Sequence, residues 1–170
     1  MTEREMQKLL AEFRRGDAGA FDKLYAGLNR EVKMFAYGIL KDYALSEDVM
    51  QEVFLKLFQT CAFEGRSSLR TYLFAMARNL SLNRLRTRSR ERGELTEASL
   101  VAPDAGGQAE KRLMIDELLD QLRPDEREVV LLKAMGFTHR EIARVVGKPA
   151  GTVMWMYNDC KKRLQSRKEG

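Results

Sequence analysis

The segment 138–153, "THREIARVVGKPAGTV", decides the fold of the C-terminal part of the chain. Thr138 and Glu141 fit the S/T-x-x-E capping box, in which the two side chains satisfy free N–H groups where a helix begins. Gly147 is suited to the positive φ that ends a helix, and Pro149 to the first turn of the next one. The pattern predicts a helix-turn-helix, whose second helix enters the DNA major groove. An ordinary helical hairpin is the alternative.

The second helix of this motif continues through residues 151–164, "GTVMWMYNDCKKRL", and its two faces differ in chemistry. At about 100° per residue, the face that we expect to be buried carries Val153, Tyr157, Cys160 and Leu164. The opposite face carries Trp155, Asn158, Asp159 and Lys162, with Met154 at its edge. Met156 flanks the buried face and is expected to belong to the core. A DNA-reading surface would therefore have Trp155 near its middle.

The sequence does not decide whether this exposed face binds DNA or a protein. Asparagine can read adenine, and methionine or tryptophan can contact thymine methyl groups. Phosphates could be bound by the basic residues of the second half, Lys161, Lys162, Arg163, Arg167 and Lys168. Phosphates would repel Asp159 unless it reads a cytosine amine, and an exposed Met–Trp pair is also typical of protein-binding surfaces. The predicted contacts with DNA or protein are Arg140, Thr152, Met154, Trp155, Asn158, Lys161 and Lys162.

The composition of the 170 residues limits the kinds of function open to the chain. A net charge of +5 and a pI near 9.3 favour a polyanionic partner. His139 is the only histidine, Cys61 and Cys160 lie far apart, and no P-loop or GxGxxG motif is present, so we expect no enzymatic activity, no cofactor and no metal site. With no apolar window near the roughly 18 residues of a membrane span and no signal-peptide pattern, we expect a cytoplasmic protein without membrane insertion and with reduced thiols.

Charge and composition divide the chain into three parts. Residues 1–92 hold 17 Lys or Arg against 12 Asp or Glu, and residues 110–170 hold 13 against 10. Between them, "GELTEASLVAPDAGGQA", 93–109, holds three acidic residues and no basic one. Its glycines and proline cannot sustain a helical period, so 93–112 is predicted to be a flexible acidic linker. Elsewhere apolar residues recur with the helical period of 3.6, and the predicted fold is all-α, with two small helical domains, 1–92 and 113–170.

Residues 46–58, "SEDVMQEVFLKLF", predict an amphipathic helix with an uneven polar face. Its broad apolar side is expected to be buried. The other side combines acidic and amide groups with one leucine, as Asp48, Gln51, Glu52 and Leu55. A leucine in an acidic, solvent-facing patch suggests a docking surface, although single exposed leucines are common on proteins. The pattern alone leaves both interpretations open.

Two neighbouring stretches have compositions that are typical of segments that bind nucleic acid. The stretch 78–92, "RNLSLNRLRTRSRER", holds six arginines and one glutamate. Arginine suits phosphates and guanine edges, whereas a solvated charged helix end is the ordinary alternative. Just before it, "FEGRSSLRTYLF", 63–74, sets polar side chains beside aromatic ones, which suits single-stranded bases. Core positions for Tyr72 and Phe74 are the alternative.

Several segments, taken in order, resemble the extracytoplasmic-function (ECF) subfamily of the sigma-70 family of bacterial RNA polymerase sigma factors. They are "RRGDAGAFDKLY", "SEDVMQEVFLKLF", "LRTYLFAMARNLSLNRLR" and "LDQLRPDEREVVLLKAMGFTHREIARVVGKPAGTV". These segments are similar to conserved regions 2 and 4, and the acidic linker lies where that family has one. The resemblance covers nearly the whole chain. It implies a region 2 helical bundle and a region 4 helix-turn-helix in a cytoplasmic protein.

The resemblance also implies roles and partners: promoter recognition, DNA opening and transcription initiation, with the polymerase supplying the catalysis. Docking on the clamp of core RNA polymerase is implied for Asp48, Gln51, Glu52 and Leu55. Capture and opening of the −10 element is implied for Arg66, Ser67, Ser68, Arg70, Tyr72, Arg78, Asn79, Asn83, Arg84 and Arg86. Region 4 would contact the polymerase flap and the −35 element. An anti-sigma factor or another regulatory protein is the further implied partner.

The second helix of the helix-turn-helix departs from the family pattern. Met154, Trp155 and Met156 stand where the family usually has Lys, Ser and Arg. Asp159 replaces a later Arg, and Tyr72 a common Trp. Two rival functions therefore stay open. One is a protein-binding adaptor on a sigma-like fold; the other is a stand-alone DNA-binding regulator, since the helix-turn-helix segment also resembles the LuxR type.

Overall fold

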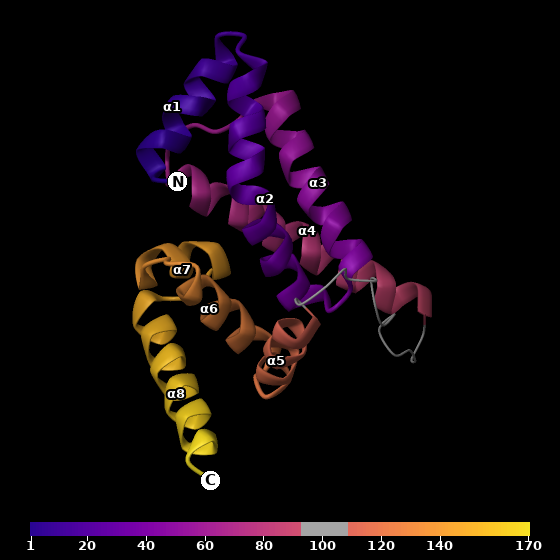
Figure 1. Cartoon of the computed structure of the whole chain (residues 1–170), viewed down its shortest axis with the longest axis vertical. Helices are drawn as coiled ribbons and strands as arrows, with labels where there is room; N and C mark the ends of the chain where they lie inside the picture. Colours follow the sequence, from indigo (N-terminus) through magenta and orange to yellow (C-terminus); the bar gives the residue numbers. More distant parts are fainter. Residues whose placement is uncertain (93–108) are drawn as a thin grey trace.

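The computed structural model describes residues 1–92 and 109–170, and their regular secondary structure is entirely helical (Figure 1). The all-α prediction is thereby confirmed for the described residues. The helices are α1 (Glu3–Arg14), α2 (Ala18–Leu40), α3 (Tyr43–Thr60), α4 (Leu69–Arg92), α5 (Ala109–Asp120), α6 (Pro124–Ala134), α7 (His139–Val146) and α8 (Ala150–Lys168). Helix α5 begins inside the predicted linker 93–112, and the rest of that linker, 93–108, lies outside the described residues.

Helices α1–α4 form an N-terminal bundle in which side chains define the helix ends. Thr2 and Glu5 make a capping box at α1, with the Thr2 N–H donating to Glu5 Oε2 at 2.6 Å. Asp42 caps α3 by accepting from a backbone N–H of its first turn at 3.1 Å. The Glu3 carboxylate accepts from the Leu69 N–H at 2.6 Å, so a residue of α1 caps α4. The start of α4 is thereby tied to the N-terminus of the chain.

Helices α5–α8 form a C-terminal domain that contains the helix-turn-helix. The Thr138 N–H donates to Glu141 Oε2 at 2.8 Å, which completes the capping box at α7. Gly147 ends α7 with a φ of 68°, in the left-handed region that favours glycine. Pro149 precedes α8, which packs against both α6 and α7. These local features follow the sequence prediction for 138–153.

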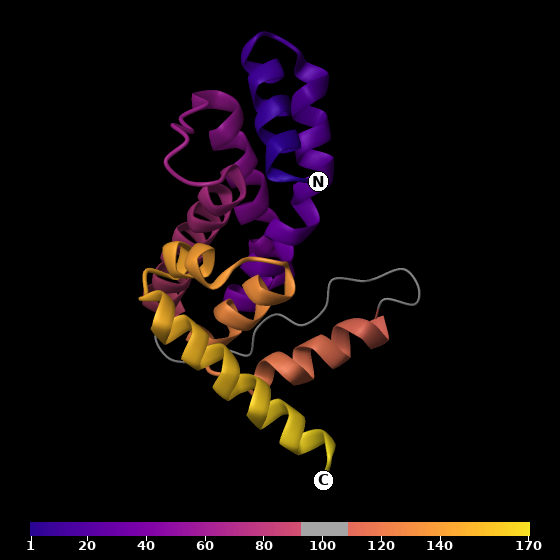
Figure 2. The same cartoon turned by 90° about the vertical axis from the view of Figure 1, so that its left-hand side faces the viewer.

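The two domains pack directly on each other, with α7 against α4 and α6 against α2 (Figures 1 and 2). The buried ring of Phe137, between α6 and α7, lies 4.9 Å from that of Phe74 in α4. Gly38 of α2 leaves room for the Leu131 side chain of α6, which would collide with any Cβ there. The apolar cores of the two domains therefore merge into one cluster. No pattern in the sequence predicts this contact.

Candidate nucleic-acid and partner interfaces

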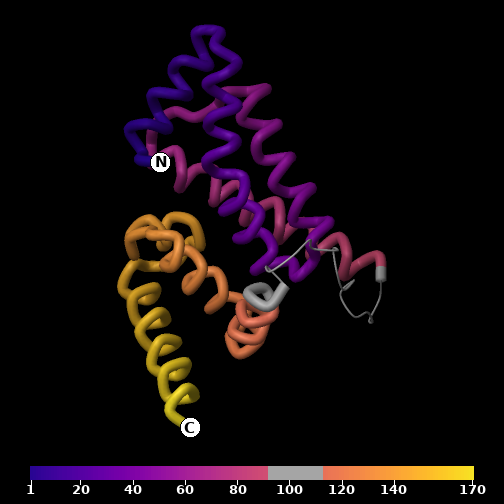
Figure 3. The backbone as a smooth tube through the Cα atoms, in the orientation of Figure 1, coloured from indigo at the N-terminus to yellow at the C-terminus, as the bar shows by residue number. Residues whose placement is uncertain are grey.

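The outer face of α8 is open to solvent, and the helix runs away from the N-terminal bundle toward the C-terminus (Figure 3). Trp155 is 64% exposed and Met154 is 48% exposed. All the residues predicted to contact DNA or protein here are exposed, and we call them the outer face of α8: Arg140, Thr152, Met154, Trp155, Asn158, Lys161 and Lys162. Arg140 belongs to the adjoining start of α7.

The inner face of α8 holds it against α6 and α7. Val153, Met156 and Cys160 are buried, whereas Tyr157 and Leu164 are half-buried. The predicted division of the two faces is therefore confirmed, including the core position of Met156. Burial raises the pKa of the Cys160 thiol, and the nearby Glu126 carboxylate acts in the same direction. The thiol is thus held in its protonated, unreactive form.

Asp159, the residue that disfavours DNA contact, is paired within α8. Its Oδ2 accepts from Arg163 Nε at 3.0 Å. Arg163 also bonds the carboxylate of Glu126 in α6, a residue only 3% exposed. The adjacent cation offsets the charge of Asp159 and weakens its repulsion of phosphates. The same pairing anchors Arg163 to α6, so this arginine is engaged inside the domain.

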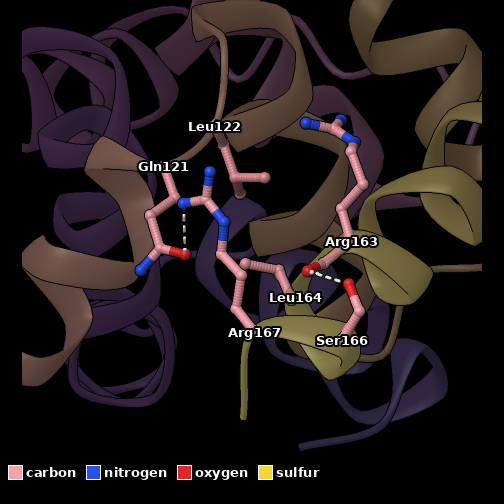
Figure 4. Close-up of a pocket in the computed structure, with 6 residues that line it drawn as sticks. All are labelled: Gln121, Leu122, Arg163, Leu164, Ser166 and Arg167. Carbon is pink, nitrogen blue, oxygen red and sulfur yellow. Dashed lines mark hydrogen bonds between the residues drawn. The ribbon is translucent and has the colours of Figure 1, made fainter. Parts of the chain in front are cut away.

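The last turns of α8 are anchored as well (Figure 4). Arg167 donates to Gln121 Oε1 at 3.0 Å, which ties α8 to the residue after α5. In this view Leu122 and Leu164 border a small pocket, and the Arg163 side chain points away from Arg167. Of the basic residues predicted to bind phosphates, the two arginines therefore make contacts within the domain. The three lysines of that set are exposed: Lys161, Lys162 and Lys168.

The polar side of α3 is largely exposed. Leu55 is 53% exposed, and Phe58, one turn further on, is 49% exposed. The Phe58 ring packs on one side against aromatic rings of α1 and α2, with centroids 5.2 and 5.1 Å away. Phe58 follows Leu55 by three residues, which places both side chains on one face of the helix. This spacing could have identified Phe58 in the sequence as part of the same surface. We call the exposed stripe the docking face of α3: Asp48, Gln51, Leu55 and Phe58.

Arg84 of α4 links this docking face to the basic helix. Its Nη2 donates to Glu52 Oε2 at 2.6 Å, and its Nη1 lies 3.7 Å from Asp48 Oδ2. Glu52 is half-buried as a result. The resemblance assigns these carboxylates to a protein partner and this arginine to DNA, whereas the structure joins all three in one ion-pair cluster.

Helix α4 presents two opposite faces. By helical spacing, one face carries residues that are exposed or half-buried, and we call it the open stripe of α4: Tyr72, Asn79, Asn83 and Arg86. Arg70 and Arg78 lie on the opposite face, in line with buried Phe74, where α7 covers the helix. The residues predicted to bind the −10 element therefore do not form a single surface in this arrangement.

Arg70 makes three kinds of contact, two of which cross to the C-terminal domain. It forms an ion pair with Glu31 of α2. It donates to the carbonyl oxygen of Met135, at the end of α6, at 2.7 Å. Its guanidinium lies 4.5 Å from the ring centroid of Phe137, within cation–π range. A role of Arg70 in binding the −10 element stays a prediction.

Two groups of ion pairs cross the contact between the domains. Arg78 Nε lies 3.2 Å from both carboxylate oxygens of Glu128 in α6. Burial raises the pKa of Glu128, and Arg78 partly offsets this effect. On α5, Asp116 accepts from the Tyr37 hydroxyl at 2.9 Å and pairs with Lys41 at 2.8 Å. Burial and Asp116 both raise the pKa of Tyr37, so its hydroxyl remains a donor.

The loop between α3 and α4 holds the remaining predicted contacts. Ser68 Oγ accepts from the Thr71 N–H at 3.0 Å and caps the first turn of α4. Ser67 and Ser68 are half-buried, whereas Arg66 is exposed and pairs with Glu64 at 2.8 Å. The Tyr72 ring lies 5.5 Å from that of Phe63. Arg66 is the loop side chain most accessible to a ligand.

Comparisons with known proteins agree with this architecture. Residues 24–91 match Sigma-70 region 2, and residues 112–158 match Sigma-70, region 4. The ECF RNA polymerase sigma factor SigX of Bacillus subtilis is 28% identical over 139 residues, covering 74% of this chain and 72% of SigX. The RNA polymerase sigma factor CarQ of Myxococcus xanthus is 30% identical over 149 residues, covering 84% of this chain and 85% of CarQ. The chain belongs to the ECF sigma factors of the sigma-70 family.

As an ECF sigma factor, the chain binds core RNA polymerase and directs promoter recognition and transcription initiation. The RNA polymerase sigma-H factor of Pseudomonas aeruginosa is 28% identical over 171 residues, covering 90% of this chain and 88% of that protein. The matched ranges place α2–α4 in region 2, and α5 through the first half of α8 in region 4. The helix-turn-helix is thus part of region 4.

Two solved structures share the fold of this ECF sigma factor. RpoE of Bartonella quintana, in complex with the anti-sigma factor NepR, gives a TM-score of 0.71 at 26% identity, covering 86% of this chain and 94% of that chain. CnrH, in complex with the cytosolic domain of CnrY, gives a TM-score of 0.71 at 20% identity, covering 97% of both chains. Both superpositions span regions 2 and 4.

The described residues were compared with the requirements of a metal site and of a membrane-spanning helix. No group of His, Cys, Asp or Glu within 1–92 and 109–170 is arranged to hold a metal ion. Over the same residues, no helix is long and apolar enough to cross a membrane. His139 Nε2 is buried without a hydrogen-bond partner, and the ring lies 6.0 Å from that of Tyr157. This histidine packs between α7 and α8.

Proposed function

We propose that regions 2 and 4 act on separate promoter elements through the open surfaces described above. Region 2, residues 1–92, docks on the clamp of core polymerase through the docking face of α3. It captures the −10 element through Arg66 and the open stripe of α4. Region 4, residues 113–170, contacts the polymerase flap and the −35 element through the outer face of α8. The observation that carries this proposal is that two exposed faces, each combining amides with cations, lie on different domains.

The open stripe of α4 has the side chains that single-stranded DNA requires. Tyr72 offers a ring on which an unpaired base can stack, which is worth about 1–3 kcal/mol per base. Asn79 and Asn83 offer amides for base edges, and Arg86 a cation for phosphate. Asn83 Oδ1 already accepts from Arg86 Nη1 at 3.2 Å, so the two side chains are held together. This combination supports strand capture after the duplex opens.

The close packing of the two domains supports the proposal that they must separate when the promoter is bound. The −10 and −35 elements lie about 25 base pairs apart, which is about 85 Å at 3.4 Å per base pair. Helix α7 packs on both α4 and α8, so where it contacts them the α4 and α8 axes are at most two helix-packing distances apart, roughly 20 Å. One protein in this arrangement cannot engage both elements at once. We infer that region 4 separates from region 2 before both elements are bound.

The closed arrangement suits an inactive form. The solved RpoE chain is in complex with an anti-sigma factor, and its similarity to this chain spans both domains. This supports the proposal that an anti-sigma factor or a similar regulator holds the present chain closed. Arg70 and Arg78, which are half-buried in the domain contact, would then be released only when that regulator leaves.

The chain itself is proposed to carry out no covalent chemistry and to work in the cytoplasm. Sigma factors are initiation factors, and the polymerase supplies the catalysis. Core polymerase and chromosomal DNA, the partners of a sigma factor, are cytoplasmic in bacteria. A stand-alone regulator, by contrast, would bind promoter DNA without core polymerase.

The direct test is to footprint a holoenzyme made from the full chain and sigma-free bacterial core polymerase on genomically selected DNA, with permanganate marking unpaired thymines. The proposal expects unpaired bases at a −10 element and a duplex footprint near −35. Asn83→Ala should lower −10 opening about tenfold and leave core affinity unchanged, because one base-edge contact is lost. Ser89→Ala, on α4 but off the open stripe, is the matched control. Opening that survives both Asn79→Ala and Asn83→Ala would contradict the assignment.

A further inference from the structure

The outer face of α8 has an apolar centre, which is unusual for a surface proposed to bind DNA. Trp155 is 64% exposed, and Met154 beside it is 48% exposed. Gly151, one turn before Trp155, is also open to solvent, since a Cβ there would meet nothing within 4 Å. This is the N-terminal part of the helix, with which helix-turn-helix proteins contact base edges. A large apolar group therefore stands free where bases are read.

The surroundings of this apolar centre are strongly positive. Residues 138–168 hold eight Lys or Arg and two Asp or Glu. Both acidic residues are engaged, Glu141 in the capping box of α7 and Asp159 with Arg163. The N-cap residue of α8, Pro149, makes no side-chain capping hydrogen bond, so the free N–H groups of the first turn add to the positive potential. The surface is thus complementary to a polyanion.

We propose that Trp155 and Met154 make α8 a reader of thymine, by packing against thymine C5-methyl groups in the major groove of the −35 duplex. This inference rests on the −35 contact proposed above. The thymine methyl is the apolar group among the base edges of the major groove, and it needs an apolar partner. Asn158 lies on the same face, one turn after Trp155, and its amide suits adenine, the base paired with thymine.

The charge pattern favours DNA over a protein as the occupant of this face. Protein-binding patches are depleted of lysine at their centre. Here Lys162 shares the face with Trp155, and Arg140 and Lys161 flank it. An apolar centre with a cationic border fits a groove lined by phosphates, in which the methyl groups are the apolar element.

The experiment compares thymine with deoxyuridine, which lacks only the methyl group. Holoenzyme made from the full chain is first used to select −35 sequences from a random library with a fixed −10 element. Each thymine of the selected −35 duplex is then replaced by deoxyuridine, and holoenzyme affinity is measured. Wild-type protein should lose about fourfold in affinity per contacted methyl, the factor that corresponds to burying one methyl-sized group.

Two variants make the test specific to Trp155. Trp155→Ala should bind thymine and deoxyuridine equally at each position that Trp155 contacts. Met114→Ala removes an apolar side chain that is 70% exposed on α5, and it should keep the fourfold difference. Circular dichroism is used to check that both variants are folded.

The possible failures separate the inference from the proposed function. A −35 footprint with no thymine in the selected sites, or with no sensitivity to deoxyuridine, overturns the inference and leaves the −35 contact intact. Opening at −10 without any −35 footprint overturns the −35 contact and the inference together. The outer face of α8 would then be a protein-binding surface.

Discussion

Arg78 of region 2 and Glu128 of region 4 form an ion pair across the domain contact, with Arg78 Nε 3.2 Å from each carboxylate oxygen. Glu128 is 4% exposed, whereas the Arg78 side chain is 22% exposed. Removing the arginine would therefore leave a carboxylate where water has little access. The pair lies on the face of α4 opposite the open stripe, so it can be altered without changing the residues proposed to capture the −10 strand.

Replacing Arg78 with methionine should loosen the closed arrangement. Methionine keeps much of the apolar stem, but it leaves Glu128 buried and unpaired. We expect a cost of about 2 kcal/mol, below that of a fully buried pair because Arg78 is partly solvated. Small-angle scattering of the free protein should show a larger radius of gyration. Arg86→Met, on the open stripe, is the matched control; equal radii for wild type and Arg78→Met would show that the pair does not hold the domains together.

Gly38 allows the same contact to be opened without changing a charge. A Cβ at this position collides with the Leu131 side chain of α6. Valine has a helix propensity no worse than that of glycine, so α2 itself should not be weakened. Gly38→Val is therefore expected to increase the radius of gyration while helicity by circular dichroism stays constant. Gly19→Val, near the start of α2, should change neither quantity, and an unchanged radius for Gly38→Val would mean that Leu131 can turn aside.

The raised pKa of Glu128 predicts a pH dependence of stability. Burial raises the pKa in the folded protein above its value in the unfolded chain, despite the opposing effect of Arg78. The folded state therefore binds the proton more tightly, and the resulting stability is lost as pH rises through the folded pKa. Between the ordinary glutamate range and neutral pH, wild type should gain stability on acidification relative to Glu128→Gln, which cannot titrate. Urea unfolding at a series of pH values measures this, and parallel curves for the two proteins would contradict the shift.

Local features of the fold could be predicted from sequence because they depend on residues a few positions apart. The capping box of Thr138 and Glu141, the turn at Gly147 and the core position of Met156 are of this kind. The i, i+4 spacing of Asp159 and Arg163 also allows their ion pair to be predicted from sequence. In this pair Arg163 offsets the charge that makes Asp159 unfavourable for DNA.

The domain contact could not be predicted in this way. Arg70 bonds the carbonyl oxygen of a residue 65 positions away, and no local pattern encodes that pairing. An arginine that binds a carboxylate also looks identical in sequence to one that binds a phosphate. This is why the resemblance implies −10 contacts for Arg70, Arg78 and Arg86 alike, although the structure places Arg86 on the open stripe of α4 and the other two on its covered face.

Leu55 should be a main contributor to core polymerase binding. It is 53% exposed in the docking face of α3, so its replacement costs the fold little. Leu55→Arg should lower affinity for core polymerase by at least about tenfold, because it places a charge in an apolar contact. Leu113→Arg, at a residue 62% exposed on α5, is the matched control and should retain affinity. The measurement is a fluorescence titration with sigma-free core, and equal losses for both variants would contradict a specific docking face.

Variants of Lys161 and Arg163 should distinguish a residue that contacts DNA from one that anchors α8 to the rest of its domain. Lys161 is exposed, so Lys161→Ala should reduce the slope of log affinity against log salt by about 1 and leave the Tm unchanged. Arg163→Ala removes a partner of buried Glu126 and frees the charge of Asp159. It should lower the Tm by a few degrees and weaken holoenzyme binding to −35 DNA through repulsion of phosphate. Adding Asp159→Ala should restore DNA binding but not the Tm; a double variant that still binds weakly would show that Arg163 contacts DNA itself.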